Sequence, residues 1–379
     1  MTTEAYIQSL KEVSLNVSDS AKRIVIAGGG TGGHIFPAVA IANALKKQEP
    51  GIQILFVGAK GKMEMEKVPQ AGFKIVGLDI AGYNRSSLFK NIILPFKLVK
   101  SFLQVQKVIK DFKPNAVIGV GGYSSFPVLR LAQAKGIPTF IHESNSFAGK
   151  SNILLGKKAT KIFVASEGMS QFFPSQKIMI TGNPVRNIFS ENNLIRSEAL
   201  EFFGLRPDKK TIFIVGGSLG AASINAAIEA ELPYFQQHDL QLIWQTGKSY
   251  EPRAADQSVS VWRNIFITKM EYAYAAADLV VSRSGAMAVS ELCVAGKPVI
   301  FVPYPFAAED HQTANAMALV HKNAALIIKD SEVKQKLIPA VEQLINDPSM
   351  MLELKKNISK LGNTTADEVI ANEILKTIK

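Results

Sequence analysis

The sequence has little cysteine and no long apolar run, and each absence limits what the chain can be. Its 379 residues include a single cysteine, Cys293, which rules out an intrachain disulfide and fits a reducing compartment. The apolar helical segment around it predicts a small core residue rather than a reactive thiol. No apolar run reaches the roughly 18 to 20 residues of a membrane-spanning helix. The N-terminal segment carries Glu4 and Glu12 but no apolar h-region, so we expect a weakly structured lead-in of about 20 residues rather than a signal peptide.

Several binding signatures are missing as well. The chain has no Gly-Lys-Ser/Thr of a Walker loop, no Asp-x-Asp for a metal-bound nucleotide, and no neighbours at metal-ligand spacing around His311 and His321. It also lacks RNA-binding, zinc-finger and helix-turn-helix signatures. The net charge is nevertheless +11, from 43 basic and 32 acidic residues. We therefore expect a nucleotide, a phosphate or an acidic lipid as the anionic partner rather than nucleic acid, and neither a metal nor a cofactor.

What the chain does have is the same glycine-rich turn twice. The segments Arg23–Leu45 and Thr211–Leu232 each run from a short apolar stretch through clustered glycines into residues with helical apolar spacing. This order predicts strand, turn and helix. Such a turn at a helix N-terminus presents backbone N–H groups and the positive end of the helix dipole to a phosphate. Two of them predict two nucleotide-type folds with a cleft between them.

A second pair of segments repeats in the same order. Residues 115–145 and 278–305 both read as strand, small-residue turn, helix, Gly-x-Pro and strand. Any two Rossmann-like segments would share this outline, so the pattern by itself indicates two α/β domains with parallel sheets and no more. We expect thirteen strands, at residues 23–27, 53–57, 74–78, 116–120, 139–142, 161–165, 177–180, 211–215, 241–245, 265–268, 279–282, 299–302 and 325–328.

The boundary between the domains is predicted near residues 182–186, a turn-rich stretch that polar residues follow. Residues 1–186 then form the first domain and residues 187–364 the second. Residues 367–379 read as a last helix, and their pattern does not say on which domain that helix packs.

The first turn departs from the dinucleotide-binding pattern. Gly28, Gly30 and Gly33 have the G-x-G-x-x-G spacing, which is a weak signal when it stands alone. The next strand runs into residues 58–60 without an acidic residue for an adenine ribose. The missing acid therefore argues against a dinucleotide oxidoreductase, which is the weakest of the functions that we consider for this chain.

Polar residues stand where α/β folds place their ligands. His34, between turn and helix, either accepts a proton from a substrate hydroxyl or hydrogen-bonds the turn. Glu291, in a helix that follows small residues, either accepts hydrogen bonds from two sugar hydroxyls or is a solvated carboxylate. Arg186, at the domain junction, either balances a diphosphate or forms a surface salt bridge. Residues 142–145 close a strand at the carboxyl edge of the first sheet, where ligands bind.

Residues 88–114 mix large apolar side chains with six lysines and hold no acid before Asp111. A helix of this composition either lies on an anionic membrane surface with its lysines toward the headgroups, or packs on the sheet with its lysines in water. Composition leaves both alternatives open.

Seven motifs follow one another along the chain: GGGTGGHIFPA, GVGGYSSFP, IHESNSFAGKSN, GNPVR, GGSLGA, RSGAMAVSE and the segment from Asp310-His311-Gln312 to Asn315-Ala316. Together they closely resemble the MurG family of bacterial GT-B glycosyltransferases, over essentially the whole chain after residue 22. The resemblance implies two Rossmann-like domains with parallel sheets that face a central cleft. The first would bind the acceptor and the membrane, the second would bind UDP-GlcNAc, and the last helix, 365–379, would pack back on the first.

The activity that this resemblance implies is the inverting transfer of GlcNAc from UDP-GlcNAc to lipid I. The acceptor is the C4 hydroxyl of MurNAc in undecaprenyl-pyrophosphoryl-MurNAc-pentapeptide, and the product is lipid II with a β-1,4 linkage. The reaction belongs to peptidoglycan synthesis and so to cell shape and cell division. The resemblance also implies a peripheral protein at the cytoplasmic face of the inner membrane, with residues 88–114 in contact with that membrane. Other cell-wall synthesis proteins would be further partners.

The resemblance also assigns roles to residues at matched positions. Near the donor sugar and acceptor it places Thr31, Gly32, Gly33 and Asn145. In the donor pocket it places Arg186, Ser218, Ile267, Ala286, Met287, Ala288, Val289, Ser290, Glu291 and Gln312, with Glu291 on the ribose hydroxyls. Other cleft positions are Tyr123, which we count among the substrate-binding residues, His142, Asn152 and Asn225. Ala288 departs from the family, which often has threonine there, so a side-chain hydroxyl contact to the donor is lost. If the backbone makes that contact instead, donor binding is unchanged, and the sequence leaves both alternatives open.

An inverting transfer needs one in-line displacement at the anomeric carbon. A base must take the acceptor proton, and the charge of the leaving UDP must be stabilised. We predict His34 as the base, with Glu143 as the second candidate, acting directly or by orienting a partner. Arg186 and the turn at residues 216–220 would stabilise the diphosphate in place of a metal. Closure of the domains would exclude water and limit hydrolysis of the donor.

Two other functions are considered beside this one. A GT-B transferase could use another acceptor, such as a diacylglycerol, although the IHESN and GNPVR motifs argue against it. A nucleotide-sugar sensor or a scaffold at the division site would bind UDP-GlcNAc without turnover. The joint presence of His34, Glu143, Glu291 and Gln312 disfavours this last function.

Overall fold

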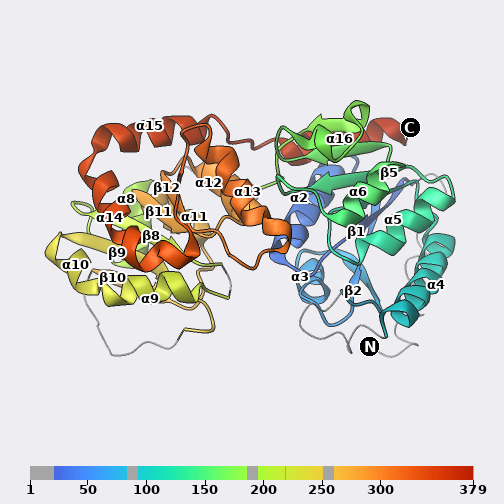
Figure 1. Ribbon diagram of the computed structural model, residues 1–379. Helices are drawn as coiled ribbons and strands as arrows, with labels where there is room; N and C mark the ends of the chain where they lie inside the picture. Colours follow the sequence, from blue (N-terminus) through green and yellow to red (C-terminus); the bar gives the residue numbers. More distant parts are fainter. Residues whose placement is uncertain (1–20, 83–92, 186–194, 218, 251–259, 379) are drawn as a thin grey trace. The chain divides into compact units, whose positions relative to one another are not determined.

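The chain forms two compact units, each built around a sheet of its own (Figure 1). The structure, a computed structural model, describes residues 21–82, 93–185, 195–217, 219–250 and 260–378. The first unit comprises Met1–Val185 together with Thr365–Lys379, and the second comprises Arg186–Thr364.

The first unit contains a seven-stranded sheet in which every pairing is parallel. The strand order is β3-β2-β1-β4-β5-β6-β7, so the winding direction changes between β1 and β4. The carboxyl ends of the strands at such a switch point are where open α/β sheets bind their ligands. The strands are β1 (Arg23–Ala27), β2 (Gln53–Ala59), β3 (Lys74–Leu78), β4 (Ala116–Gly119), β5 (Thr139–Glu143), β6 (Lys161–Val164) and β7 (Ile178–Ile180).

Two apolar cores lie on the opposite faces of this sheet, because successive strand residues point to opposite sides. Ile24 and Ile26 of β1 belong to one core, and Val25 and Ala27 belong to the other. Helices cover both faces, which is the usual arrangement for a parallel sheet. They are α2 (Gly32–Gln48), α3 (Glu64–Gln70), α4 (Leu94–Phe112), α5 (Ser125–Ala134), α6 (Lys150–Gly156), the 3-10 turns η2 (Met169–Gln171) and η3 (Ser175–Lys177), and α16 (Ala366–Thr377).

The last helix of the chain, α16, packs against α2 within the first unit. Ile370, Ala371 and Ile374 are fully buried and join the same core as Ile24 and Ile26 of β1. The first unit is therefore completed by the C-terminal end of the sequence.

The second unit contains a six-stranded parallel sheet in the order β10-β9-β8-β11-β12-β13. Its winding direction changes between β8 and β11. The strands are β8 (Lys210–Val215), β9 (Leu240–Gln245), β10 (Val261–Asn264), β11 (Leu279–Ser282), β12 (Val299–Phe301) and β13 (Leu326–Ile327). The helices are α8 (Arg196–Phe203), α9 (Ala222–Ala230), α10 (Leu232–Gln237), α11 (Met270–Ala276), α12 (Ala286–Ala295), α13 (His311–Val320), α14 (Val333–Asn346) and α15 (Pro348–Ser359), with the 3-10 turns η4 (Ala308–Asp310) and η5 (Asp330–Glu332).

Twelve of the thirteen predicted strands overlap an observed strand, and the one predicted at residues 265–268 is wrong. The ladder instead pairs Val261–Asn264 with Leu242–Gln245 of β9. Ile265 and Phe266 look like strand residues in the sequence, but each is 51% exposed. Their neighbour Ile267 donates its amide to the Gln245 side chain, so this segment leaves the sheet.

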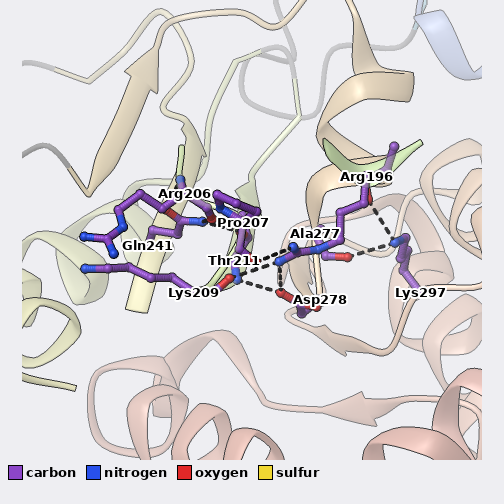
Figure 2. Close-up of polar contacts among 10 residues, drawn as sticks. Arg196, Arg206, Pro207, Lys209, Thr211, Gln241, Ala277, Asp278 and Lys297 are labelled. Carbon is purple, nitrogen blue, oxygen red and sulfur yellow. Dashed lines mark hydrogen bonds and ion pairs between the residues drawn. The ribbon is translucent and has the colours of Figure 1, made fainter. Parts of the chain in front are cut away.

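A polar network ties α8 to the amino end of the second sheet (Figure 2). The Arg196 guanidinium donates to Asp278 Oδ2 at 2.9 Å and to the backbone oxygen of Lys209 at 3.0 Å. The same carboxylate oxygen accepts from Thr211 N at 2.8 Å, so Asp278 joins β8 to β11. Nearby, the Lys297 ammonium donates to the backbone oxygen of Ala277 at 2.8 Å. These contacts lie at the opposite end of the strands from the edge where α/β sheets bind ligands.

In the part of the chain that the structure describes, no helix is both long enough and apolar enough to span a bilayer. Cys293 is buried and free, as predicted, and burial raises the pKa of its thiol to about 12. The predicted lead-in at the N-terminus and residues 88–92 of the lysine-rich segment lie outside the described residues.

Candidate active site

The glycine-rich turn after β1 lies at the switch point of the first sheet, and the protein itself occupies its first three amides. Gly28 N donates to Val57 O at 3.1 Å, and Gly29 N donates to Gly121 O at 3.3 Å. Gly30 N donates to Glu64 Oε2 at 2.8 Å. The expectation that this turn offers its backbone N–H groups to a phosphate is therefore wrong for residues 28–30.

Glycine is required in this turn because a carboxylate lies against it. Glu64, the first residue of α3, is 1% exposed, and its other oxygen accepts from Ala59 N at 2.9 Å. A Cβ at Gly29, whose φ is +147°, would lie 2.3 Å from Glu64 Cδ, and one at Gly58 would lie 2.5 Å from Glu64 Cγ. Sequence reasoning missed Glu64. The signal that could have found it is a glycine just before the last residue of a strand, followed shortly by an acid at a helix start.

His34, in the first turn of α2, is held by the same glycine-rich turn. Its Nδ1 lies 3.1 Å from Gly29 O and 3.3 Å from Thr31 Oγ1. A carbonyl oxygen only accepts, so the contact with Gly29 assigns the proton to Nδ1 and leaves Nε2 as the acceptor nitrogen. A Cβ at Gly121 would lie 2.7 Å from Nε2, which shows that the ring lies along the turn after β4. The imidazole thus hydrogen-bonds the turn through one nitrogen and has base character at the other.

A buried histidine lies near this imidazole, and a half-buried tyrosine lies next to the glycine-rich turn that holds it. His142, in β5, is fully buried, and burial lowers its pKa to about 4, with the nearby His34 acting in the same direction. It is therefore neutral at physiological pH. Tyr123, in the turn after β4, lies within 4.0 Å of a Cβ built on Gly30, and burial raises its pKa, with the Glu64 charge acting in the same direction.

Glu143, the last residue of β5, is 4% exposed and accepts four hydrogen bonds. Oε1 accepts from the backbone and side-chain nitrogens of Asn145, at 3.1 and 3.2 Å. Oε2 accepts from Gly149 N at 3.1 Å and from Asn152 Nδ2 at 2.8 Å. The carboxylate therefore fixes the loop between β5 and α6. This geometry favours the orienting role that was considered for Glu143 over direct proton transfer.

At the switch point of the second sheet, Gln245 links the second glycine-rich turn to its neighbour. This residue ends β9 and is 3% exposed. Its Nε2 donates to Gly217 O at 2.9 Å, and its Oε1 accepts from the buried Ile267 N at 2.8 Å. The family resemblance pointed to Ile267, whereas Gln245 was missed, although its position at the carboxyl end of a strand was an available signal. Ser218, in the same turn, lies outside the described residues, as does Arg186.

Arg283, which follows β11, joins three segments of this edge and was also missed. Its Nη1 donates to Val302 O at 3.0 Å, to Pro303 O at 3.1 Å and to Asp330 Oδ1 at 2.5 Å. Its Nη2 donates to Ser223 Oγ at 3.2 Å, at the start of α9. The guanidinium thus fixes the helix that follows the glycine-rich turn relative to the ends of β11 and β12.

Gln312, in α13, accepts hydrogen bonds through both its side chain and its backbone. Its side-chain Oε1 accepts from Tyr304 N at 2.9 Å, and its backbone oxygen accepts from Ser284 Oγ at 2.8 Å. Asn315 donates in turn to Ser284 O at 3.2 Å. These bonds place the predicted donor residue Gln312 next to the segment that leads into α12.

Glu291, within α12, is 8% exposed, so the solvated-carboxylate alternative is wrong. The Tyr274 hydroxyl donates to its Oε2 at 3.4 Å. Met287 and Val289 are also buried, and Val289 N donates to Gly285 O within the helix start. The partly exposed members of the predicted run are Ala286, Ala288 and Ser290.

Comparisons with known proteins decide the family. The glycosyltransferase family 28 N-terminal domain matches residues 24–164, and the glycosyltransferase family 28 C-terminal domain matches residues 211–373. A crystal structure of MurG from Acinetobacter baumannii has a TM-score of 0.73 and 30% identity, and the match covers 94% of this chain and 99% of that one. The chain belongs to the MurG family.

Curated relatives place the chain well inside the MurG family. The UDP-N-acetylglucosamine--N-acetylmuramyl-(pentapeptide) pyrophosphoryl-undecaprenol N-acetylglucosamine transferase of Parabacteroides distasonis is 52% identical over 361 residues, which are 94% of this chain and 98% of the relative. The protein of the same name from Phocaeicola vulgatus is 53% identical over 360 residues, with 93% and 96% covered. The expected fold, two all-parallel Rossmann-like domains of the GT-B type, is confirmed.

Proposed function

We propose that this MurG-family protein is an inverting transferase that moves GlcNAc from UDP-GlcNAc to the C4 hydroxyl of MurNAc in lipid I, giving lipid II. The observation that carries the proposal is the identity of about half of all residues, over nearly the full length, with proteins named as that transferase. The carboxyl edges of the two sheets supply groups whose chemistry matches the two halves of the reaction.

The first unit would activate the acceptor. His34 Nε2 takes the proton of the C4 hydroxyl, and the oxygen forms a bond to the anomeric carbon of the donor. The bond from that carbon to the β-phosphate oxygen breaks, and its electron pair leaves with UDP. The fixed Nδ1–H tautomer supports this role, since a base must present a lone pair. Glu143 orders the loop that carries Asn145, while Thr31, Gly32, Gly33 and Tyr123 would contact the substrates.

The second unit would hold the donor. The N-terminus of α9, which follows the turn at residues 216–220, would offer backbone N–H groups and a helix dipole to the diphosphate. Arg186 and Ser218 would complete its charge balance. The buried Glu291 carboxylate would accept the two ribose hydroxyls, with Tyr274 fixing its orientation. The remaining donor contacts would come from Ile267, Ala286, Met287, Ala288, Val289, Ser290 and Gln312.

We also propose that the protein works as a peripheral protein at the cytoplasmic face of the membrane, held there by α4. One face of this helix is buried and includes Val105, Val108 and Ile109. The opposite face exposes Phe96, Val99 and Leu103 at 76%, 62% and 63%, among lysines. One helix thus packs on the sheet and also presents a basic, apolar surface suited to anionic lipid, which supports the proposed membrane contact.

The test is UDP release from UDP-GlcNAc by the purified protein, with and without a lipid I analogue. Release that requires the analogue supports the transferase. Binding of UDP-GlcNAc without release would favour a sensor. Release with a diacylglycerol but not with the lipid I analogue would favour a transferase with another acceptor.

A further inference from the structure

The carboxylate of Glu64 is buried without a basic side chain as counter-ion in the described part of the chain. No ion pair joins it to a lysine or arginine among the described residues. A buried charge needs hydrogen bonds in place of water. Glu64 obtains them from two backbone amides, Ala59 N at 2.9 Å and Gly30 N at 2.8 Å. Glycines at positions 29 and 58 leave the room that the carboxylate occupies.

The amide of Gly30 belongs to the same peptide group as the carbonyl of Gly29. Its N–H donates to Glu64 Oε2, and its oxygen lies 3.1 Å from His34 Nδ1. One planar peptide group therefore stands between a carboxylate and an imidazole. A carboxylate that polarises the N–H makes the carbonyl oxygen at the other end a stronger acceptor, because hydrogen bonds in a chain reinforce one another.

We propose that Glu64 is a positioning residue of the reaction, which acts through the Gly29–Gly30 peptide group to hold His34 with its proton on Nδ1 and its lone pair on Nε2. The arrangement has the logic of a catalytic triad, in which an acid orients an imidazole, with a peptide group inserted between them. Its effect on turnover rests on the proposed function. Its effect on the imidazole does not.

The other titratable groups near His34 do not duplicate this effect. His142 on β5 is buried and neutral, and Tyr123 after β4 carries no charge at neutral pH, because burial raises its pKa further. On α16, which packs on α2, Glu368 pairs with Lys47 at 2.9 Å, near the far end of α2 from His34.

Two further carboxylates of α16 and α3 pair with lysines elsewhere. Glu373 of α16 pairs with Lys161 on β6. On α3, Glu66 pairs with Lys67 at 3.2 Å on the exposed side of the helix. Among these described groups, the carboxylate linked to His34 by hydrogen bonds through a single peptide group is that of Glu64.

The first experiment uses the wild-type protein. ¹⁵N NMR of labelled histidine reports which ring nitrogen carries the proton, and a His34→Gln variant assigns the His34 signals among the five histidines. We expect His34 to populate the Nδ1–H tautomer. A dominant Nε2–H tautomer would overturn the proposal, whatever the variants do.

The second experiment compares Glu64→Gln, Glu64→Asp and Asp367→Asn. Glutamine removes the charge and satisfies only one of the two amides, while aspartate keeps the charge. Asp367 is a second buried carboxylate of the same unit, 5% exposed on α16, and serves as the matched control. In E64Q we expect the pKa of His34 to fall by about 0.5 to 1 unit, because imidazolium loses a stabilising negative charge. In E64D the pKa of His34 should stay close to the wild-type value, because the negative charge is kept. In D367N it should not change.

Kinetics separate a positioning role from a structural one. In E64Q we expect kcat to fall about tenfold and the acid limb of its pH profile to move to lower pH, with the KM for UDP-GlcNAc within about twofold of wild type. A folded E64Q protein with an unchanged acid limb and an unchanged His34 titration refutes the proposal. If the wild type releases no UDP with the lipid I analogue, the proposed function fails, and the NMR titration alone still decides the coupling of Glu64 to His34.

Discussion

Replacing Gln245 with leucine tests how the second glycine-rich turn is held. The side chain is 3% exposed, and its amide joins Gly217 O to Ile267 N at 2.9 and 2.8 Å. Ile267 is 2% exposed, so its amide cannot turn to water when Gln245 is removed. An unsatisfied buried amide costs about 1–3 kcal/mol in the free energy of unfolding. Gly217 is exposed, and its carbonyl exchanges the lost bond for water at small cost.

The chain offers a matched control on the same strand. Gln241, at the other end of β9, is 1% exposed and also bridges backbone (Figure 2). It accepts from Arg206 N at 3.0 Å and donates to Arg206 O at 2.6 Å and to Thr211 Oγ1 at 2.9 Å. Gln241→Leu should therefore cost a similar amount of stability, about 1–3 kcal/mol. It lies at the amino edge of the sheet, away from the proposed donor site.

Urea unfolding and calorimetry with UDP measure the two effects separately. We expect both variants to lose stability, but only Gln245→Leu to weaken UDP binding, by about tenfold or 1.4 kcal/mol. The reason is that Gln245 fixes the turn that would receive the diphosphate, whereas Gln241 fixes the opposite edge. Equal losses of UDP affinity in both variants, or an unchanged affinity in Gln245→Leu, would refute this reasoning.

Three further outcomes are expected. His34→Ala should lower kcat by about 10²- to 10⁴-fold with UDP affinity unchanged by calorimetry, and near wild-type turnover would remove it as the base. Phe96→Asp should reduce co-sedimentation with anionic vesicles, whereas Leu352→Asp, at an exposed leucine of the second unit, should not. Burial lowers the pKa of Lys297 from 10.5 to about 8, so the unfolded state binds more protons between these values. The stability of the wild type relative to Lys297→Met should therefore rise from pH 8 to 10.5 in urea unfolding, and a flat difference would contradict this.

The sequence was sufficient for the architecture because apolar runs, glycine turns and helical spacing all agree in each half. It misplaced β10, since the apolar residues Ile265 and Phe266 follow the strand instead of forming it. The ring of Trp262 in β10 contacts that of Phe203, with centroids 4.8 Å apart, and no local sequence pattern reveals this contact.

The candidate site was predictable only where a residue stands next to a recognisable turn. His34 and Glu291 were found in this way. Glu64 and Gln245 were missed because each holds the site through a backbone amide that is distant in the sequence, 34 residues away for Glu64 and 22 for Gln245. The four hydrogen bonds to Glu143 are local. An acid that ends a strand nevertheless looks the same in sequence whether its oxygens are hydrogen-bonded within the protein or accessible to a substrate.

The place of α16 has a consequence for how the protein is made. The second unit is one continuous stretch of chain, so the ribosome delivers all of it before the first unit is complete. Until Ile370 and Ile374 emerge, the apolar side of α2 has no cover from the helix that seals it. We therefore expect the first unit, although most of it is synthesised first, to complete its core after the second unit. A chain that stops near residue 364 would leave it open to aggregation.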